Sequence, residues 1–229
     1  AAGVAATCYI TKKSNIDNAI TMDMGGTSCD VALVENNEPV TTTDREIDFD
    51  IPVPIPMVDV EAIGAGGGSI AWVDNQGILK VGPKSAGANP GPAFYGNGKG
   101  HFTISDANLL LGYIHPQAFM AGEFPVKVDD AIDAAKNVGK GMNEEDEIKI
   151  AKGVITVANH NMSNTLRETL VKKGRDPRDF TLIAFGGAGA LHATSIARIL
   201  SIPKVVVPTR SSVFCAFGAT LLDARHDYY

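Results

Sequence analysis

Cysteines are few and basic runs are absent in this 229-residue chain. The three cysteines, Cys8, Cys29 and Cys215, are odd in number and far apart, which argues against a disulfide framework and fits a reducing cytoplasm. Lysine and arginine number 20 against 26 aspartates and glutamates, a net charge of −6. We therefore expect no nucleic-acid partner and no membrane-surface partner. The most apolar stretch, residues 182–200, is broken by glycines, a histidine and an arginine, so it is not expected to span a membrane.

Common catalytic and metal-binding signatures are also lacking. The five histidines are scattered, and no HxH, HExxH or CxxC spacing occurs, which argues against a dedicated zinc site. No G-x-x-x-x-G-K-[ST] loop and no G-x-S-x-G elbow is found, which argues against a P-loop NTPase and an α/β-hydrolase.

Glycine is abundant and unevenly distributed. Eleven of the 24 glycines fall within residues 61–100, so regular helices cannot fill the middle of the chain. This composition predicts an inserted, β-rich subdomain over residues 44–128. The flanking segments, 1–43 and 129–229, are predicted to form one α/β domain.

Hydrophobic periodicity and helix-breaking residues predict the individual elements. We expect helices over residues 1–11, 106–111, 129–138, 148–173 and 191–200, and strands over 19–24, 30–35, 39–43, 181–185 and 204–207. The last strand, helix and strand in this order predict a parallel β-α-β unit.

The first candidate site is a glycine turn between two predicted strands, with the sequence Asp23-Met24-Gly25-Gly26-Thr27-Ser28-Cys29-Asp30. Glycines let backbone N–H groups approach a phosphate, and the hydroxyls of Thr27 and Ser28 can donate to its oxygens. Asp23 and Asp30 could then hold Mg²⁺ or orient an attacking group, as in phosphoryl transfer. The alternative is a hairpin turn flanked by solvated carboxylates.

Two further glycine loops are candidates. Gly186, Gly187 and Gly189 stand between a predicted strand and a predicted helix, a position that suits an anion or nucleotide, although a tight packing turn would also need small residues. The second loop is a phosphate or substrate-loop candidate, with a flexible hinge as the alternative. It comprises Gly66, Gly67, Gly68 and Ser69.

Taken together, these motifs resemble the hydantoinase A/5-oxoprolinase family, which includes the nucleotide-binding subunits of acetone and acetophenone carboxylases. The resemblance is collinear over the whole chain and rests on residues 23–33, 63–71, 81–96, 105–109, 176–180, 185–193 and 211–227.

The resemblance implies a ribonuclease-H-like lobe of the actin, sugar-kinase and chaperone ATPase fold. It also implies that Asp23–Asp30 is a phosphate hairpin, with Asp23 as the Mg²⁺ ligand, and that Gly186, Gly187 and Gly189 lie beside the adenosine. The family's first lobe, which has its own such hairpin, is not found in these residues, so we expect a second lobe that works with a missing N-terminal lobe. A companion subunit of the hydantoinase B type is the implied partner.

The resemblance favours an ATP- and Mg²⁺-dependent hydrolase of a small cyclic amide, such as 5-oxoproline or a hydantoin. Two alternatives stay open, an ATP-dependent ketone carboxylase and a nucleotide-binding module without chemistry of its own. One departure is informative, because Phe94 replaces the cysteine common in family members and excludes a thiol role there.

Overall fold

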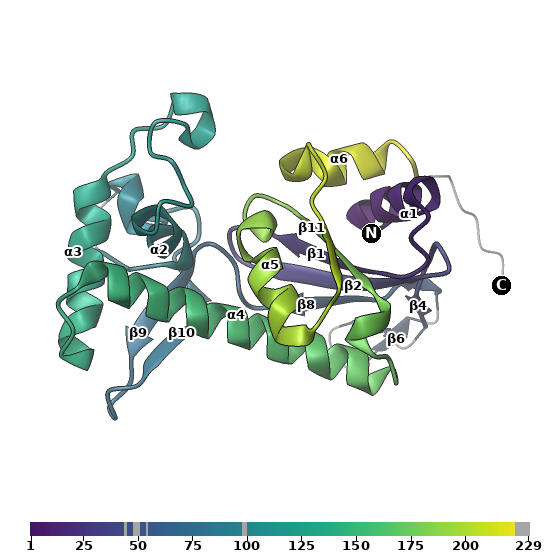
Figure 1. Ribbon diagram of the computed structural model, residues 1–229, viewed down its shortest axis with the longest axis horizontal. Helices are drawn as coiled ribbons and strands as arrows, with labels where there is room; N and C mark the ends of the chain where they lie inside the picture. Colours follow the sequence, from purple (N-terminus) through teal and green to yellow (C-terminus); the bar gives the residue numbers. More distant parts are fainter. Residues whose placement is uncertain (44, 48–50, 54, 98–99, 223–229) are drawn as a thin grey trace.

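The computed structural model describes residues 1–43, 45–47, 51–53, 55–97 and 100–222. Two parts lie side by side along one long helix, α4, which extends across both in Figure 1. The part that contains the N-terminus is built on the main sheet. The other part contains the β9–β10 hairpin with helices α2 and α3.

The main sheet is mixed, with β1 and β2 at its centre. Along the sheet the order is β12-β11-β1-β2, and both β3 and β8 pair with β2. β11 and β12 run parallel to β1, whereas β2 is antiparallel to β1, β3 and β8. The strands are β1 (Ala19–Met24), β2 (Cys29–Glu35), β3 (Glu38–Pro39), β8 (Val60–Ile63), β11 (Thr181–Phe185) and β12 (Lys204–Val206). This topology confirms the predicted α/β, ribonuclease-H-like class.

Helices cover both faces of this sheet. Helices α1 (Ala2–Ser14) and α6 (Phe214–Ala219) pack on one face, and α4 (Glu147–Lys172) and α5 (Gly189–Leu200) pack on the other (Figure 1). Side chains of a strand alternate between faces, so β11 is buried throughout. Leu182 and Ala184 join the core beneath α4 and α5, whereas Ile183 and Phe185 join the core beneath α1 and α6.

The second part packs a hairpin and two helices on the first half of α4. The hairpin consists of β9 (Ser69–Val73) and β10 (Leu79–Ser85), and the helices are α2 (Ile104–Leu110) and α3 (Val128–Gly139). Phe94 is fully buried, with its ring 5.2 Å from that of Phe119.

The remaining elements are short. Two small sheets pair β4 (Thr41–Thr42) with β7 (Met57–Val58) and β5 (Arg45–Ile47) with β6 (Ile51–Val53). Single 3₁₀ turns cover Ala93–Tyr95, Phe119–Gly122, Lys140–Met142, Pro177–Asp179 and Ser211–Val213. Within the described ranges, no helix has the length and apolar character needed to cross a bilayer.

Several boundaries differ from those expected. The strand expected at 39–43 is divided, because β3 pairs with β2 while β4 pairs with β7. The short helix starts at Ile104, two residues early, because the Thr103 side chain caps it. β8 belongs to the main sheet although it lies inside the predicted insertion, 44–128. The division into 1–43, 44–128 and 129–229 stays a prediction, and residues 223–227 of the resemblance lie outside the described ranges.

Candidate functional site

The Asp23–Asp30 segment forms a tight hairpin between β1 and β2. Gly25 N–H donates to the Ser28 carbonyl at 2.9 Å and closes the turn. Asp23 and Asp30 are directly opposite each other in the strand register, both half-buried. Their side chains line one cavity of about 250 Å³, which also borders Cys215. The two predicted catalytic carboxylates therefore lie together on one face of the hairpin.

Cys215 was not identified as a site residue from the sequence, yet it contacts Asp23. The Cys215 Sγ donates to Asp23 Oδ2 over 2.9 Å, across 192 positions of sequence. Burial, together with the hydrogen bond to Asp23 and the negative charge of Asp23, raises the pKa of the Cys215 thiol to about 11. No local motif could have revealed this contact, because it depends on how α6 packs against the end of β1.

The loop of Gly66, Gly67, Gly68 and Ser69 packs directly on the hairpin turn. Gly67 N–H donates to the Gly25 carbonyl at 3.0 Å, and Gly68 N–H donates to the Gly26 carbonyl at 2.6 Å. A Cβ on Gly66 would lie 2.5 Å from the Thr27 carbonyl carbon, so no larger residue fits without a shift. Because all four residues are buried, the loop packs against the turn and supports it, and it is not a flexible hinge. Its contact with a substrate stays a prediction.

The loop that contains Gly186, Gly187 and Gly189 also contacts the hairpin. Gly186 has a φ of +82°, and a Cβ there would lie 2.6 Å from Asp23 Oδ1. Ala188 N–H donates to the Met24 carbonyl at 3.0 Å. Gly187 is exposed, with no atom within 4 Å of the position that a Cβ would take, and Gly189 is the first residue of α5. The structure thus brings all three predicted glycine loops together at the β1–β2 turn.

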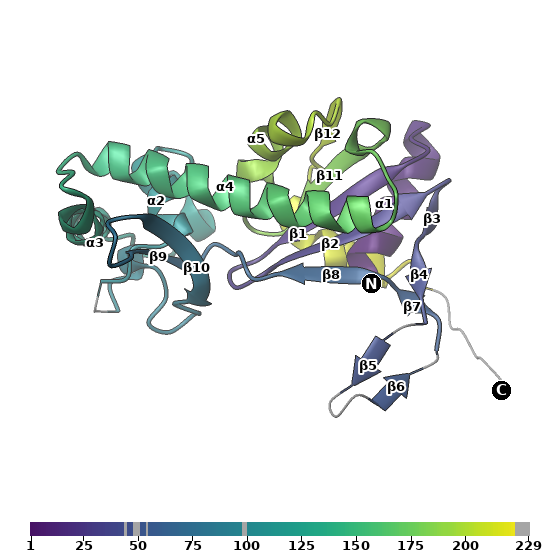
Figure 2. The same cartoon turned by 90° about the horizontal axis from the view of Figure 1, so that it is seen from below.

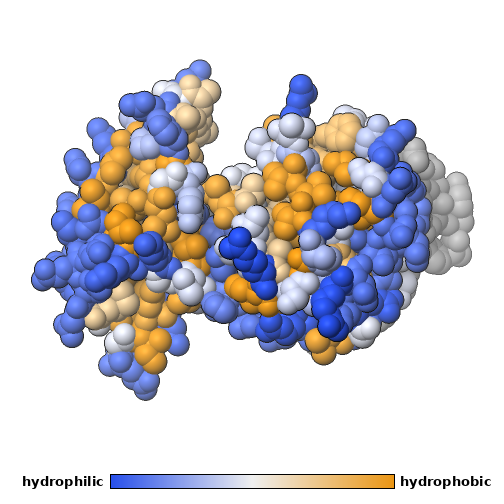
Figure 3. All heavy atoms as spheres, viewed as in Figure 1, coloured by the Kyte–Doolittle hydropathy of each residue, from blue (hydrophilic) through white to orange (hydrophobic). Residues whose placement is uncertain are grey.

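The outer side of this junction is accessible. Gly26, Thr27 and Gly187 are exposed. Among the described residues, the N–H groups of Gly26 and Thr27 have no backbone acceptor. Figure 3 shows an indentation of the surface between the two parts, near the place where the β1–β2 turn lies in Figure 1. Free N–H groups and hydroxyls on an exposed turn are suited to bind an anion such as a phosphate.

The carboxylate pair can supply only part of a metal's coordination shell. Among the described residues, no group of three or more histidine, cysteine, aspartate or glutamate side chains could hold a metal ion. Mg²⁺ commonly takes one or two carboxylates and completes its shell with water and substrate phosphates. Asp23 and Asp30 fit that role, since both supply oxygen ligands beside a turn suited to phosphate.

Behind the site, three helices are joined by His192, which lies fully buried on α5. Its Nδ1 is 2.7 Å from Asn159 Oδ1 on α4, and its Nε2 is 3.2 Å from Asn108 Nδ2 on α2. A neutral ring with its proton on Nδ1 satisfies both contacts. Burial lowers the pKa of His192 to about 4. Sequence reasoning left His192 among scattered histidines because its partners come from distant helices.

Asp106 is another buried polar group, and its role is structural. Its carboxylate accepts hydrogen bonds from the N–H groups of Ala93, Phe94 and Thr103, and from the Thr103 hydroxyl, at 2.7–3.1 Å. Burial raises the pKa of Asp106, while these donors act in the opposite direction. The side chain therefore fixes the 3₁₀ turn at Phe94 to the start of α2.

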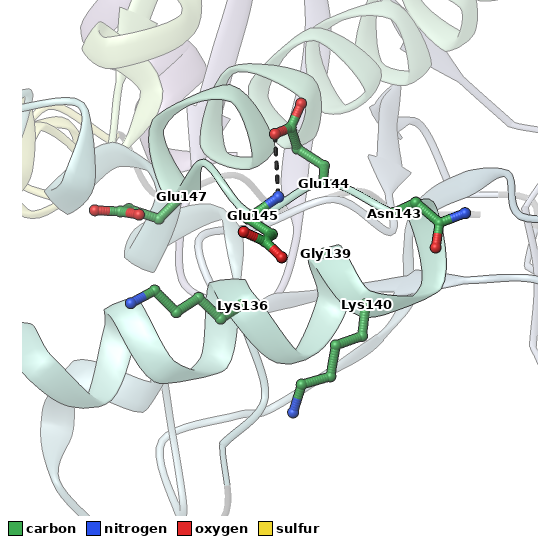
Figure 4. Close-up of a pocket in the computed structure, with 7 residues that line it drawn as sticks. All are labelled: Lys136, Gly139, Lys140, Asn143, Glu144, Glu145 and Glu147. Atoms are coloured by element: carbon green, nitrogen blue, oxygen red, sulfur yellow. Dashed lines mark hydrogen bonds between the residues drawn. The ribbon is translucent and has the colours of Figure 1, made fainter.

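Another hollow lies at the connection between α3 and α4 (Figure 4). It measures about 730 Å³ and its charged lining residues are Lys136, Lys140, Glu144, Glu145 and Glu147. Glu144 accepts hydrogen bonds from the N–H groups of Glu145 and Asp146, both at 3.1 Å. In Figure 4 Lys140 points away from these glutamates. Glu144 therefore stabilises the turn between α3 and α4. The charged side chains that line this hollow do not converge on one ligand position.

The comparisons with known proteins point to one family. The hydantoinase/oxoprolinase family model matches residues 1–228. The chain is 41% identical over 220 residues to caprolactamase subunit alpha of Pseudomonas jessenii, covering 95% of this chain and 31% of that protein. It is 36% identical over 229 residues to the acetophenone carboxylase gamma subunit of Aromatoleum aromaticum, covering 99% of this chain and 31% of that protein.

Two solved structures share the fold over 95% of this chain and 31% of theirs. One is a nucleotide-free acetone carboxylase, with a TM-score of 0.85 and 30% identity. The other is the ATP-dependent caprolactamase from P. jessenii, with a TM-score of 0.84 and 38% identity. The chain thus spans about a third of the length of these relatives. With a family model that matches nearly every residue, the chain belongs to the hydantoinase/oxoprolinase family.

Proposed function

We propose that this chain is the nucleotide-binding second lobe of an ATP-dependent enzyme that opens a cyclic amide. The observation that carries the proposal is the junction at the β1–β2 turn, where Asp23 and Asp30 line one cavity and the exposed residues Gly26 and Thr27 carry N–H groups without a backbone acceptor. The similarity to an ATP-dependent caprolactamase supports the cyclic-amide class.

In this proposal the turn binds phosphate. The N–H groups and the hydroxyls at Gly26, Thr27 and Ser28 would hold the phosphates, while Gly25 closes the turn. Gly186, Gly187 and Gly189 would border the adenosine side. Asp23, the proposed metal ligand, and Asp30 would hold Mg²⁺, which neutralises charge on the transferring phosphoryl group.

The chemistry addresses a specific obstacle, the resonance that makes an amide a poor electrophile. The amide oxygen would attack the γ-phosphorus of ATP, forming a new O–P bond as the bond to ADP breaks. Water then adds to the activated carbon, the carbon–nitrogen bond breaks, and phosphate leaves. The products are an open-chain amino acid, ADP and inorganic phosphate. Asp30, opposite Asp23 in the strand register, would orient an attacking group.

A ketone carboxylase is the second candidate, supported by the similarity to acetone and acetophenone carboxylases. The same phosphate turn would activate a ketone or bicarbonate. Identity to the caprolactamase subunit, 41%, exceeds the 36% to the carboxylase subunit, which favours the amide reaction.

The proposal includes partners. Relatives named as alpha, beta and gamma subunits support a companion subunit, for which we propose the hydantoinase B type. We also propose that an N-terminal lobe closes over the exposed side of the turn. The isolated chain is then expected to bind ATP weakly. The three free thiols support a cytoplasmic location.

The test is ATP turnover by the protein that carries this chain, assayed with its companion subunit. Lactams are compared with ketones plus bicarbonate. Stimulation by a lactam without bicarbonate supports the hydrolase, and stimulation only by a ketone with bicarbonate supports the carboxylase. Asp23→Asn should abolish turnover with the fold intact, whereas Asp133→Asn, on the exposed side of α3, should leave turnover unchanged. Near-normal turnover in Asp23→Asn would contradict the assignment.

A further inference from the structure

A second cavity lies in the part of the chain that the hairpin site does not use. It measures about 670 Å³ and separates the β9–β10 hairpin from α3, which lie side by side below the first half of α4 in Figure 2. Its wall includes Ala71, Val73, Phe102, Ala134 and Val138. A volume within roughly 300–1,000 Å³ and a mainly apolar wall are typical of small-molecule sites.

The only tryptophan of the chain lines this cavity. Trp72 is 44% exposed, which is high for so large an apolar side chain. Its indole N–H donates to the Gly82 carbonyl at 2.8 Å, so the polar end of the ring is already satisfied and its orientation is fixed. A ligand can therefore pack against the exposed part of the ring without a further loss of side-chain entropy at Trp72.

The polar residues that line this cavity, apart from Trp72, are Lys84, His101 and Asn137, and all three are exposed. Among the described lining residues there is no aspartate or glutamate. An apolar wall with N–H donors and a lysine charge at its edge matches a ligand with an apolar body and a single negative group.

We propose that this cavity binds a small apolar carboxylate, with its hydrocarbon body against Trp72 and Val73 and its carboxylate beside Lys84 and His101. This site is separate from the phosphate turn and does not depend on the proposed function. The two are nevertheless connected, because Ala86 N–H, just after β10, donates to the Gly68 carbonyl at 2.8 Å in the loop that supports the turn.

The test is calorimetric titration of the chain with hexanoate, with hexanamide as the neutral analogue and acetate as the short one. Hexanoate should bind saturably and change the emission of Trp72, a signal that Trp72→Phe removes. Hexanamide should bind about five-fold more weakly, since the lost carboxylate charge pairs with Lys84 only at a solvent-exposed edge. Acetate should show no saturable binding.

Two lysine variants locate the site. Lys84→Gln should weaken hexanoate binding about five-fold and leave hexanamide binding unchanged. Lys80→Gln, on the same strand but outside the cavity lining, should leave both unchanged. Absence of saturable heat and of any emission change with hexanoate overturns the site. Equal affinity for hexanoate and hexanamide, or equal effects of the two lysine variants, overturns the carboxylate assignment.

Discussion

The thiol of Cys215 donates a hydrogen bond to Asp23 Oδ2 at 2.9 Å, which joins α6 to the first carboxylate of the proposed phosphate-binding turn between β1 and β2. Since the pKa of this thiol is raised to about 11, it is protonated at neutral pH and acts as a donor. The thiolate is the reactive form of cysteine. Cys215 should therefore alkylate roughly 100-fold more slowly at pH 8 than an unperturbed thiol.

Replacement of Asp23 tests the cause of that protection. Asp23→Asn removes the charge and the acceptor of the hydrogen bond, so the pKa of Cys215 should fall and alkylation by iodoacetamide should accelerate, as measured by peptide mass spectrometry. Cys8, whose pKa is raised first by burial and without a contribution from Asp23, serves as the internal reference. An unchanged rate at Cys215 in Asp23→Asn would show that burial alone protects the thiol.

His192 makes the stability of the fold depend on pH. Its pKa is about 4 in the folded chain against an ordinary value of 6.5, so the unfolded chain takes up the proton first as the pH falls. The stabilisation is fully present above pH 6.5 and is lost progressively as the pH falls towards 4. The loss amounts to roughly 3 kcal/mol in the free energy of unfolding.

Urea unfolding between pH 7.5 and 4.5 measures this loss. His192→Gln should be less stable at neutral pH and should have a shallower pH dependence, because the titrating ring is gone. His160→Gln, on the exposed side of α4, should retain the wild-type slope. Equal slopes for the wild type and His192→Gln would refute the role of this histidine.

Gly66→Ala tests the contact between the buried loop and the turn. The new Cβ would lie 2.5 Å from the Thr27 carbonyl carbon, which is backbone and cannot move alone. We expect a loss of about 2 kcal/mol in the free energy of unfolding. Gly64→Ala is the matched control, because nothing lies within 4 Å of its Cβ position, and it should be near neutral. Similar effects of the two substitutions in thermal and urea unfolding would mean that the turn tolerates displacement.

Asp106→Asn probes the buried carboxylate at the start of α2. An amide at this position cannot accept all four hydrogen bonds, and its NH₂ group would face donors. The expected loss is about 3 kcal/mol in the free energy of unfolding, measured by urea denaturation. Asp133→Asn, exposed on α3, should change stability little. A small effect of Asp106→Asn would imply that water enters and completes the hydrogen bonds.

The sequence was most informative where local chemistry decides the structure. The strands at 19–24 and 181–185 match β1 and β11, because their apolar runs are bounded by turn residues. The end of α4 is also predictable from Gly174, which has a φ of +64°, and Pro177. The glycine loops were identified as candidates because their composition has a conformational cost that few plain connections need.

Long-range partners could not be predicted in the same way. Strand β8 is short and lies within a glycine-rich region, so its pairing with β2 depends on the register of Ala62 with Asp30 rather than on local preference. The contacts of Cys215 with Asp23 and of His192 with Asn159 join positions separated by 192 and 33 residues. Each of these contacts depends on how the helices pack on the sheet, which no pattern in a single sequence encodes.

Helix α4 has a mechanical consequence. Its 26 residues form one unbroken rod of about 39 Å that contacts α2 and β10 at one end and α5 and β8 at the other. A continuous helix resists bending, so the two parts of the chain cannot swing independently about a flexible joint along it. We expect the β1–β2 hairpin and the Trp72 cavity to move together as one rigid unit, so that a displacement at one end of α4 also displaces the other end without any change in local folding.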